Sequence, residues 1–419
     1  MSRKAESQYD VVVAGGGAGG VGAALGAARA GARTCLIEKY GFLGGAATHS
    51  QVLAYCGFFQ QGTEPVPAIA GAADLVLDEL RSLGMDGRPF RSETTGNWII
   101  LLEPEGVKRA LDRVLAAHGI DVLLHTRVAA ASRTAHAIES VVAAGMDGRS
   151  RLVAEAFVDA TGDANLALVA GLAHRIGDET GHLQAATAPI RIGGLDRRMA
   201  IDRAAIIAAL ARYKDEGGAY PTARTDGGIY TRLPGSGDMW WMIIDLPLKD
   251  LSSRTISDAE RTMRAAAHDY VALLRRDVPG FESCHLVQTG PQIGVRESRH
   301  PEARYEMTGE DLRTGRQRSD GVARAAWPAE LHGEAGKPVY IPVGGDGYAH
   351  IPLDALRARG VDNLYYAGRV IGADPTAYGS VRVMGTGFAS GEAAGVAAAR
   401  RDADAHAIRD TIRKIGGLV

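Results

Sequence analysis

The sequence predicts an α/β protein in which a Rossmann-like domain is interrupted by an inserted α+β domain. Two observations predict this class. A short apolar run near the N-terminus leads into a glycine cluster, an alanine-rich stretch and a second apolar run. Glycine- and alanine-rich segments return near the C-terminus, whereas the middle holds three of the four tryptophans. We therefore expect the first domain over 1–168 and 353–419, with the insert over 169–352.

The N-terminal elements form one βαβ unit. Residues 9–14, YDVVVA, are a short continuous apolar run, which is typical of a buried parallel strand. After the glycine cluster, the alanine-rich stretch 18–30 predicts a helix that Gly31 ends. Residues 33–38, RTCLIE, predict a second buried strand. The crossover between the two parallel strands is expected to be right-handed.

The later elements follow the same kind of reasoning. Residues 41–67 are rich in glycine and predict a loop against a ligand, and 103–119 predict a helix with acids at its start and glycine at its end. Further strands are expected at 120–128, 138–145, 150–158 and 361–369, a strand and turn at 156–167, and a helix at 380–400. The segments 138–145 and 150–158 predict a small meander.

The glycine cluster carries the clearest chemical signal. Residues 15–20 satisfy GxGxxG directly after a strand and at the start of a helix. Gly15 permits the tight turn, Gly17 lets the backbone approach a pyrophosphate, and Gly20 lets the helix pack closely on the strand. Glu38 ends the second strand, where a carboxylate accepts hydrogen bonds from adenosine ribose hydroxyls. The unit therefore predicts a dinucleotide site, and the motif alone leaves FAD and NAD both open.

Several further segments resemble one family. EKYGFLGGAAT (38–48), DATGDANLA (159–167), VDNLYYAGRVIGAD (361–374) and GSVRVMGTGFASGEAAGVAAA (379–399) resemble the glutathione-reductase-like FAD fold. GVRESRHPEARYEMTGED (294–311) is similar to the GIRESR-type motif of one branch of FAD-dependent oxidoreductases, in the neighbourhood of the fumarate reductase-type flavoproteins. The resemblance covers about half of the chain and implies FAD as the cofactor.

The resemblance also implies the residues that contact FAD. Asp374 is expected to hold the ribityl hydroxyls, and the helix over 379–399 to direct its N-terminus at the flavin pyrimidine edge, where it would stabilise reduced flavin. The expected FAD contacts are Gly15, Gly17, Ala18, Gly19, Gly20, Glu38, Lys39, Gly44, Gly45, Ala46, Thr48, Val128, Thr161, Gly162, Asp163, Gly368, Arg369, Asp374, Ser380, Val383 and Met384.

Five residues are candidates for the chemistry. Arg382 is the nearest match to an arginine that holds a substrate carboxylate in the fumarate reductase branch. Arg296 belongs to a charged cluster that is either a solvated ion-pair face or a contact to flavin or substrate. His49 is a possible base, substrate contact or covalent flavin anchor, or a hydrogen-bonded loop histidine. Tyr378 and His350 are possible substrate contacts.

Four other side chains have weaker claims. His300 is a further possible substrate contact, next to the charged cluster. Cys56 is read as a small buried hydrophobe, and Trp240 and Trp241 as core or pocket wall. We expect FAD to be bound without a covalent bond.

Composition excludes several classes of function. The chain of 419 residues carries 47 basic and 49 acidic side chains and no basic run, so nothing points to a nucleic-acid partner. Its three cysteines form no CxxC, and no metal site is expected. No apolar stretch reaches the ~18 residues of a membrane span, and the first ten residues lack the apolar core of a signal peptide. We expect a cytoplasmic protein, possibly a homo-oligomer.

These observations predict an FAD-dependent oxidoreductase. The expected reaction removes a hydride from a small organic substrate, at a C–H next to O, N or C, onto flavin N5. Oxygen or another carrier would reoxidise the flavin, and its identity is left open. No second GxGxxG with its strand and helix is found. One alternative is a flavin-dependent monooxygenase that needs an external reductant, and a less favoured one is a non-catalytic nucleotide-binding protein.

Overall fold

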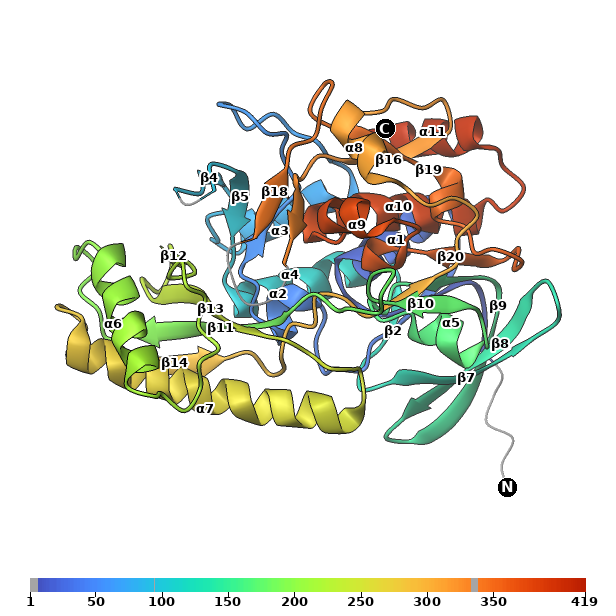
Figure 1. The fold of residues 1–419 in the computed structure, drawn as a ribbon. Coiled ribbons are helices and arrows are strands. Elements are labelled where there is room, and N and C mark those ends of the chain that lie inside the picture. Colours follow the sequence, from blue (N-terminus) through green and yellow to red (C-terminus); the bar gives the residue numbers. More distant parts are fainter. Residues whose placement is uncertain (1–6, 94, 333–337) are drawn as a thin grey trace.

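The computed structural model describes residues 7–93, 95–332 and 338–419. Its buried apolar side chains form two hydrophobic cores. The first core runs from Tyr9 to Val419, so it draws on the N-terminal and C-terminal parts of the described chain. The second is confined to residues between Leu183 and Ile293, in the part of the molecule at the lower left of Figure 1. The boundaries 169–352 predicted for the insert stay a prediction, and the second core occupies a narrower range.

The first core surrounds a largely parallel sheet with the strand order β6-β2-β1-β9-β8-β7, in which β20 also pairs with β9. Its strands are β1 (Ser7–Ala14), β2 (Thr34–Ile37), β6 (Asp121–Leu123), β7 (Arg127–Arg133), β8 (Ile138–Gly145), β9 (Gly148–Asp159) and β20 (Leu364–Tyr366). Val12 pairs with Cys35 on one side and with Phe157 on the other. Because both faces of β1 are covered, its residues form a continuous apolar run rather than an alternating one. The Rossmann-like fold predicted from the sequence is confirmed.

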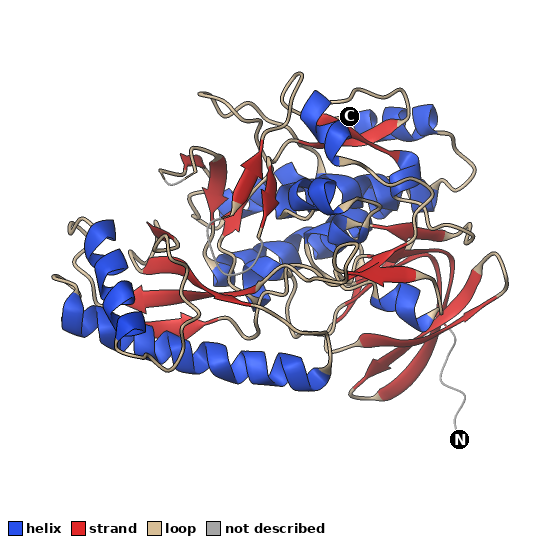
Figure 2. Ribbon diagram, viewed as in Figure 1, coloured by secondary structure: helices blue, strands red, loops and turns tan. Residues whose placement is uncertain are grey.

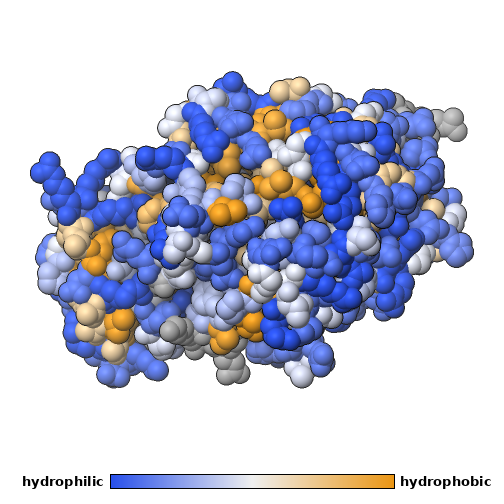
Figure 3. Space-filling view, turned by 90° about the horizontal axis from the view of Figure 1, so that it is seen from above, coloured by the Kyte–Doolittle hydropathy of each residue, from blue (hydrophilic) through white to orange (hydrophobic). Residues whose placement is uncertain are grey.

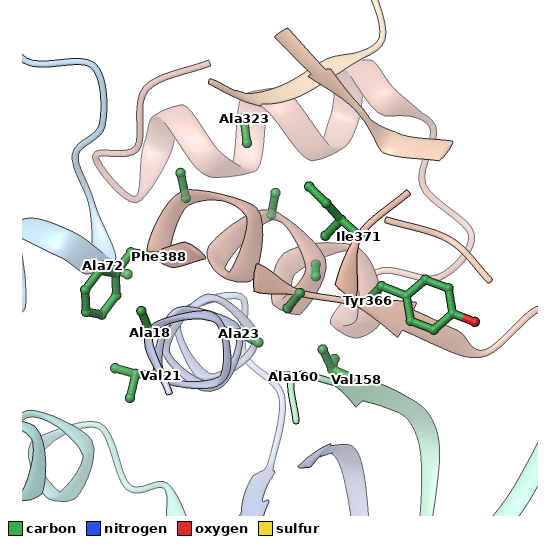
Figure 4. Packing of buried hydrophobic residues seen from close by; sticks show 14 of the residues in the cluster. Ala18, Val21, Ala23, Ala72, Val158, Ala160, Ala323, Tyr366, Ile371 and Phe388 are labelled. Atoms are coloured by element: carbon green, nitrogen blue, oxygen red, sulfur yellow. The ribbon is translucent and has the colours of Figure 1, made fainter. Parts of the chain in front are cut away.

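Two helices cover this sheet at unusually short separation. They are α1 (Ala18–Arg29) and α10 (Met384–Ala399), which lie side by side in Figure 4. A Cβ atom on Gly391 would lie 2.1 Å from the carbonyl oxygen of Gly19, and one on Gly395 would lie 2.0 Å from that of Ala23. Glycine at these positions therefore lets the two backbones touch, which brings the N-terminal and C-terminal parts of the chain together.

The meander branches from the same sheet. The first half of β9 pairs with β8, while its last residues pair with β20. The single strand predicted over 120–128 is wrong, because the chain turns between β6 and β7. His125 adopts a left-handed conformation there, with φ of 51°. The turn redirects the chain from the edge of the parallel sheet into the antiparallel meander.

The second core lies between an antiparallel sheet and two helices. The sheet has the order β12-β13-β11-β14, and Figure 2 shows the helices beside its strands. The elements are β11 (Ala186–Gly193), α6 (Arg203–Asp215), β12 (Ile229–Arg232), β13 (Met239–Leu246), α7 (Ser253–Asp277) and β14 (His285–Thr289). Trp241, Ala267 and Leu274 are buried where α7 packs on the sheet.

The remaining elements complete the first core and its rim. They are α2 (Ala46–His49), β3 (Ala54–Tyr55), α3 (Ala72–Ser82), β4 (Pro89–Arg91), β5 (Trp98–Leu101), α4 (Pro104–Ala117), α5 (Asn165–Val169), β10 (His174–Ile176), β15 (Arg299–Pro301), α8 (Gly309–Thr314), β16 (Gly321–Ala325), β17 (Ala329–Leu331), β18 (Val339–Ile341), β19 (Ala349–Pro352), η1 (Leu353–Ala355), η2 (Gly368–Val370), α9 (Pro375–Val381) and α11 (Ala405–Lys414). The helix predicted over 380–400 is in fact two, because the chain breaks at Arg382 between α9 and α10.

The surface is mixed in polarity. On the face seen in Figure 3, apolar side chains form small groups separated by hydrophilic ones. Within the described ranges, no helix is both long enough and apolar enough to cross a membrane.

Candidate active site

A cleft with an empty volume of about 710 Å³, its open mouth included, follows the carboxyl ends of the parallel strands. Its walls come from the segments directly after β1, β2, β9 and β20. In open α/β sheets, ligands bind at this edge because the loops and helix N-termini converge there. Most of the predicted cofactor contacts line this cleft: Gly15, Gly17, Ala18, Gly19, Glu38, Lys39, Gly45, Ala46, Thr161, Gly162, Asp163, Gly368, Arg369, Val383 and Met384.

The glycine turn after β1 forms a cradle for a phosphate group. Gly15 has φ of 99°, and a Cβ there would lie 2.4 Å from the carbonyl oxygen of Ala160. Gly17 precedes α1 and supplies no side-chain cap, so the N–H groups of the first turn keep no side-chain partner. Unpaired N–H groups and the partial positive charge of a helix N-terminus favour an anion such as a pyrophosphate.

Glu38 lies at the end of β2 and is only 6% exposed. Its Oε2 accepts a hydrogen bond of 2.6 Å from the Gly16 N–H, and its Oε1 accepts one of 2.9 Å from the Tyr40 N–H. The two backbone donors fix the carboxylate against the turn. Each oxygen keeps a lone pair for a hydroxyl group in the cleft.

The opposite wall is held by an ion pair between Asp163 and Arg369. Nη2 of Arg369 lies 2.7 Å from Oδ1 of Asp163, and its Nη1 donates to the Val295 carbonyl at 2.8 Å. Burial raises the pKa of Asp163, but Arg369 and Lys39 outweigh it, so the pKa lies below its usual range. Arg369 thus joins the turn after β9, the strand β20 and the segment returning from the insert.

A second cavity, the chamber, adjoins the cleft. It has an empty volume of about 1030 Å³, its mouth included, and its walls include Trp240 and Met242 of β13 and Trp327 between β16 and β17. Six residues line both cavities: Ala46, His49, Arg369, Arg382, Val383 and Met384. We call these six residues the junction. Burial raises the pKa of the Cys56 thiol in the chamber wall, which keeps the thiol protonated.

The chamber has a charged wall built on β13, β17 and β18. Arg296 lies 2.9 Å from Asp245, and the pKa of Asp245 falls to about 2 because Arg296 and His332 outweigh the effect of burial. Glu330 accepts hydrogen bonds from His332 at 2.9 Å and from Tyr340 at 3.0 Å. Burial raises the pKa of Glu330. The neighbouring His332, Arg382 and Arg296 outweigh this effect and hold that pKa well below its usual range.

His49 is a partly exposed residue of the junction. Its Nδ1 lies 2.6 Å from the Ser50 hydroxyl and 3.2 Å from the amide nitrogen of Gln292. Burial, with the nearby Arg369 and Lys39 cations, lowers its pKa to about 3. The ring is therefore neutral at neutral pH. Because the Gln292 amide nitrogen can only donate, Nδ1 is the acceptor and Nε2 carries the proton.

Several predicted residues lie away from both cavities. The predicted cofactor contacts in this group are Gly20, Gly44, Thr48, Val128, Asp374 and Ser380. The expectation that Asp374 faces the cleft is not met, because its carboxylate caps α9 and accepts the N–H groups of Ala377 at 2.7 Å and Gly309 at 2.8 Å. Directly after β20, the cleft is lined by Ala367, Gly368 and Arg369.

Two candidate catalytic residues, Tyr378 and His350, also lie away from both cavities. The Tyr378 hydroxyl donates to the Arg296 carbonyl at 2.6 Å, so it positions that segment rather than facing a cavity. Nδ1 of His350 accepts the Arg318 N–H at 2.9 Å, and the residue lines neither cavity. The Arg296 cluster is not a solvated face, since Arg296 and Glu297 are buried, and Glu297 pairs with His300 at 2.9 Å.

Sequence reasoning missed six polar or charged residues in and beside the two cavities. They are Tyr40, Asp245, Gln292, Glu330, His332 and Tyr340. The closely spaced Glu330 and His332 on one face of a short strand were the available signal. The two residues alone, without the partners that lie far along the chain, did not distinguish a site from an ordinary polar loop.

The fold and the cleft define the class: a Rossmann-like dinucleotide-binding protein with a second cavity beside the nucleotide cleft. Residues 10–413 match the family of FAD dependent oxidoreductases, and the chain belongs to that family. FAD is therefore its cofactor. The uncapped N-terminus of α1, the glycine cradle and the Glu38 carboxylate all fit that group.

Solved structures share the fold at low sequence identity. The p-nitrophenol 4-monooxygenase PnpA from Pseudomonas putida DLL-E4 is 13% identical, with a TM-score of 0.51, over 97% of this chain and 84% of that one. CabE, an aromatic hydroxylase from angucycline biosynthesis, is 14% identical, with a TM-score of 0.52, over 97% of this chain and 65% of that one. A comparison with curated proteins finds no match.

Proposed function

We propose that the protein removes a hydride from a small organic substrate held in the chamber. When bound, FAD supplies the acceptor for that hydride at flavin N5, and oxygen or another carrier reoxidises it. The observation that carries the proposal is the junction, since its six residues line the cleft and the chamber together. A flavin ring at the junction would continue from the ADP part of FAD in the cleft and would face a substrate in the chamber.

The cofactor assignment follows the walls of the cleft. The glycine cradle at the start of α1 would hold the pyrophosphate, and Glu38 would accept the ribose hydroxyls. Helix α10 begins at Met384, beside the junction, without a side-chain cap, and the Gly385 N–H in its first turn donates to the Cys56 carbonyl at 2.8 Å. A positive helix end there would stabilise negative charge on the reduced cofactor. The relation to fumarate reductase-type flavoproteins is part of this proposal.

Arg382 is the residue that we assign to an anionic group of the substrate or of the reduced cofactor. Arg296 and Arg369 each have a carboxylate partner, at 2.9 and 2.7 Å. Arg382 has no ion pair with any described residue. It donates to the Glu330 carbonyl at 3.0 Å, and its buried Nε has no hydrogen-bond partner. The side chain is half-buried and forms no direct ion pair with the nearby Glu330 carboxylate, so its guanidinium would stabilise an incoming anion.

We expect Arg382→Lys to keep FAD bound but to slow substrate-driven flavin reduction by at least ~10-fold, or about 1.4 kcal/mol. Lysine keeps the charge but loses the planar fork of donors. Stopped-flow absorbance under anaerobic conditions measures the rate. Arg304→Lys, at an exposed ion pair with Asp362, is the control and should leave the rate unchanged. An unchanged rate in Arg382→Lys would make this arginine structural.

The test of the proposed function is an anaerobic screen. A panel of secondary alcohols, primary amines and 2-hydroxy acids is mixed with the holoenzyme, and the loss of the oxidised flavin absorbance is followed. Bleaching by at least one compound, with the matching ketone or imine product, supports hydride removal. If none bleaches the flavin, while NADPH does so and oxygen then enters a product, the protein is a monooxygenase.

The monooxygenase alternative has an observation of its own. The chamber wall carries the indoles of Trp240 and Trp327 and the side chain of Met242, which suit a flat apolar substrate. Two solved structures with this fold are named as a monooxygenase and an aromatic hydroxylase. We prefer hydride removal, because the chamber also carries a hydrogen-bonded group of titratable side chains, Glu330, His332 and Tyr340. A non-catalytic nucleotide-binding role would leave that group without a use.

A further inference from the structure

Two opposite charges in the chamber wall, Arg382 and Glu330, form no ion pair with each other. The other arginines of this wall, Arg296 and Arg369, are each held by an aspartate, at 2.9 and 2.7 Å. Arg382 instead reaches the main chain of Glu330, and it lies near enough to lower the pKa of that carboxyl. The chamber wall therefore presents a cation and an anion that lie near each other without direct contact.

The Glu330 carboxylate is held in one orientation and is still accessible. Its Oε1 accepts hydrogen bonds from His332 at 2.9 Å and from Tyr340 at 3.0 Å, and its Oε2 accepts the Trp327 indole N–H at 3.3 Å. Its side chain is 13% exposed, whereas that of His332 is only 3% exposed. Because a carboxylate oxygen can accept two hydrogen bonds, Oε2 keeps one position for a donor in the chamber.

The guanidinium of Arg382 also keeps most of its donors. It carries five N–H groups, and the acceptor found for it among the described residues is the Glu330 carbonyl, at 3.0 Å from Nη2. The residue is half-buried and lines both the chamber and the cleft. A planar guanidinium can bind a carboxylate through two parallel hydrogen bonds. Arg382 is therefore suited to the carboxylate of a ligand.

We propose that the substrate is an α-amino acid, whose amino group contacts Glu330 and whose carboxylate contacts Arg382. The proposal rests on the proposed function and names its substrate class. A molecule with one group of each sign on the same carbon is the charge complement of this wall. That carbon also carries the C–H bond which hydride removal requires. Trp240, Met242 and Trp327 line the chamber, so an apolar side chain suits the remaining space.

The oxidation of an amino acid requires no protein base at the moment when the hydride leaves. The ammonium group first releases one proton to water. The C–H bond then breaks and its electron pair leaves as hydride for flavin N5, while the nitrogen lone pair forms the new C=N bond. The carbon is oxidised, and the product is a cationic iminium, whose charge Glu330 stabilises as it develops. Water adds to the iminium carbon and releases ammonium and a 2-oxo acid.

An alcohol would require a base, because its O–H proton leaves together with the hydride. The titratable side chains described in the chamber wall are poorly suited to that task. Burial raises the pKa of Cys56 and of Tyr340, so both stay protonated, and the pKa of Glu330 is held well below its usual range. Nδ1 of His49 is engaged by neighbouring groups, and Nδ1 of His332 is buried. The chamber therefore favours an amine over an alcohol.

The first arm of the test measures binding without turnover. Aminoisobutyrate and α-methylphenylalanine carry both charged groups but no hydrogen on the carbon between them, so neither can be oxidised. For each, a matched amine has a methyl group in place of the carboxylate, and a matched acid has one in place of the amino group. Calorimetry with the oxidised FAD holoenzyme compares the three affinities.

We expect at least one of the two amino acids to bind at least ~10-fold more tightly than its matched amine and its matched acid, because a hydrogen bond to a charged group contributes at least that factor. This comparison uses the wild type only. If neither amino acid binds more tightly than its matched probes, the proposal is overturned.

Two variants assign the groups. Glu330→Gln keeps an acceptor for Tyr340 and Trp327 but loses the charge, so it should weaken the amino acid and the amine at least ~10-fold and leave the acid unchanged. Arg382→Gln should weaken the amino acid and the acid but not the amine. Glu139→Gln, exposed on the meander, is the control and should change none. Equal weakening of all three probes in both variants would indicate structural roles and contradict the assignment.

The second arm adds α-amino acids with apolar side chains to the anaerobic panel of alcohols, amines and 2-hydroxy acids. We expect an amino acid to bleach the flavin faster than any alcohol and to yield ammonium and the 2-oxo acid. If an alcohol bleaches the flavin and no amino acid does, the proposal is overturned and the proposed function stands. If the amino acid probes bind tightly but no compound bleaches the flavin, the proposed function fails, and the amino acid remains the ligand of the chamber.

Discussion

At the scale of single residues, backbone contacts decide what a side chain can offer a ligand. Glu38 is held by the N–H groups of Gly16 and Tyr40, so its carboxylate cannot turn away from the cleft. Arg369 is held by Asp163 and by two carbonyls, which makes it a structural brace as well as a wall of the cleft. Arg382 forms no direct ion pair of this kind with a described residue, although Glu330 lies near it.

Glu38→Ala should weaken FAD retention roughly 10- to 150-fold. A hydrogen bond to a charged group is worth about 1.5–3 kcal/mol, which corresponds to that range of affinity. The variant also leaves the Gly16 N–H without its partner. FAD affinity is measured by fluorescence titration of the deflavinated protein. Glu139→Ala, at an exposed position on the meander, is the control. Equal affinities in both variants would contradict the role of Glu38.

His49 should make stability depend on pH. Its folded pKa is about 3, below the unfolded value of ~6.5, so the unfolded chain binds the proton first as the pH falls. The contribution is complete above pH ~6.5 and is lost progressively towards the folded pKa. Between pH 7 and 5, the wild type should lose about 1–2 kcal/mol more unfolding free energy than His49→Gln. Urea unfolding at both pH values measures this, and parallel losses would refute it.

At the scale of elements, the packing of α1 on α10 holds the cleft in shape. Gly391→Ala should lower the unfolding free energy by about 1–3 kcal/mol, because its Cβ would lie 2.1 Å from a backbone oxygen that cannot move alone. Gly106→Ala in α4 is the matched control. There the Cβ meets only the flexible end of Met85, at 2.7 Å, so we expect little change or a gain. Thermal unfolding compares the two.

At the scale of the molecule, FAD would join segments far apart in the chain. The walls of the cleft come from residues near 15–45, 160–163 and 367–387. A ligand that binds only the folded state stabilises it by about 2.7 kcal/mol at 100 times its Kd. Removal of FAD should therefore lower the unfolding temperature, and added FAD should restore it in proportion to its concentration.

The same preparation tests whether the flavin is covalently attached. The neutral His49 ring is engaged by Ser50 and Gln292, and we expect non-covalent FAD. Acid precipitation should leave the flavin in the supernatant, and the released cofactor should contain adenine. Flavin that stays with the pellet would make His49 the candidate anchor.

The sequence by itself determined the local elements that bind the nucleotide. The glycine turn, the helix and Glu38 lie within about 25 residues, so each constrains the next through short-range backbone geometry. The later strand and turn around Asp163 and the junction residue Arg382 were also found from the sequence, because each lies in a compact glycine-rich segment.

Only the tertiary structure decided which side chains meet in the chamber. Asp374 stands near the expected place in the sequence, yet it caps α9, and Arg369 lines the cleft instead. The charged wall of the chamber brings His332 beside Glu330 and Asp245, and Asp245 on β13 lies nearly ninety positions earlier in the chain. Such contacts depend on how the sheet that contains β13 packs against the first core. Local pattern and propensity carry no information about that packing, because it is set by long-range burial of apolar surface.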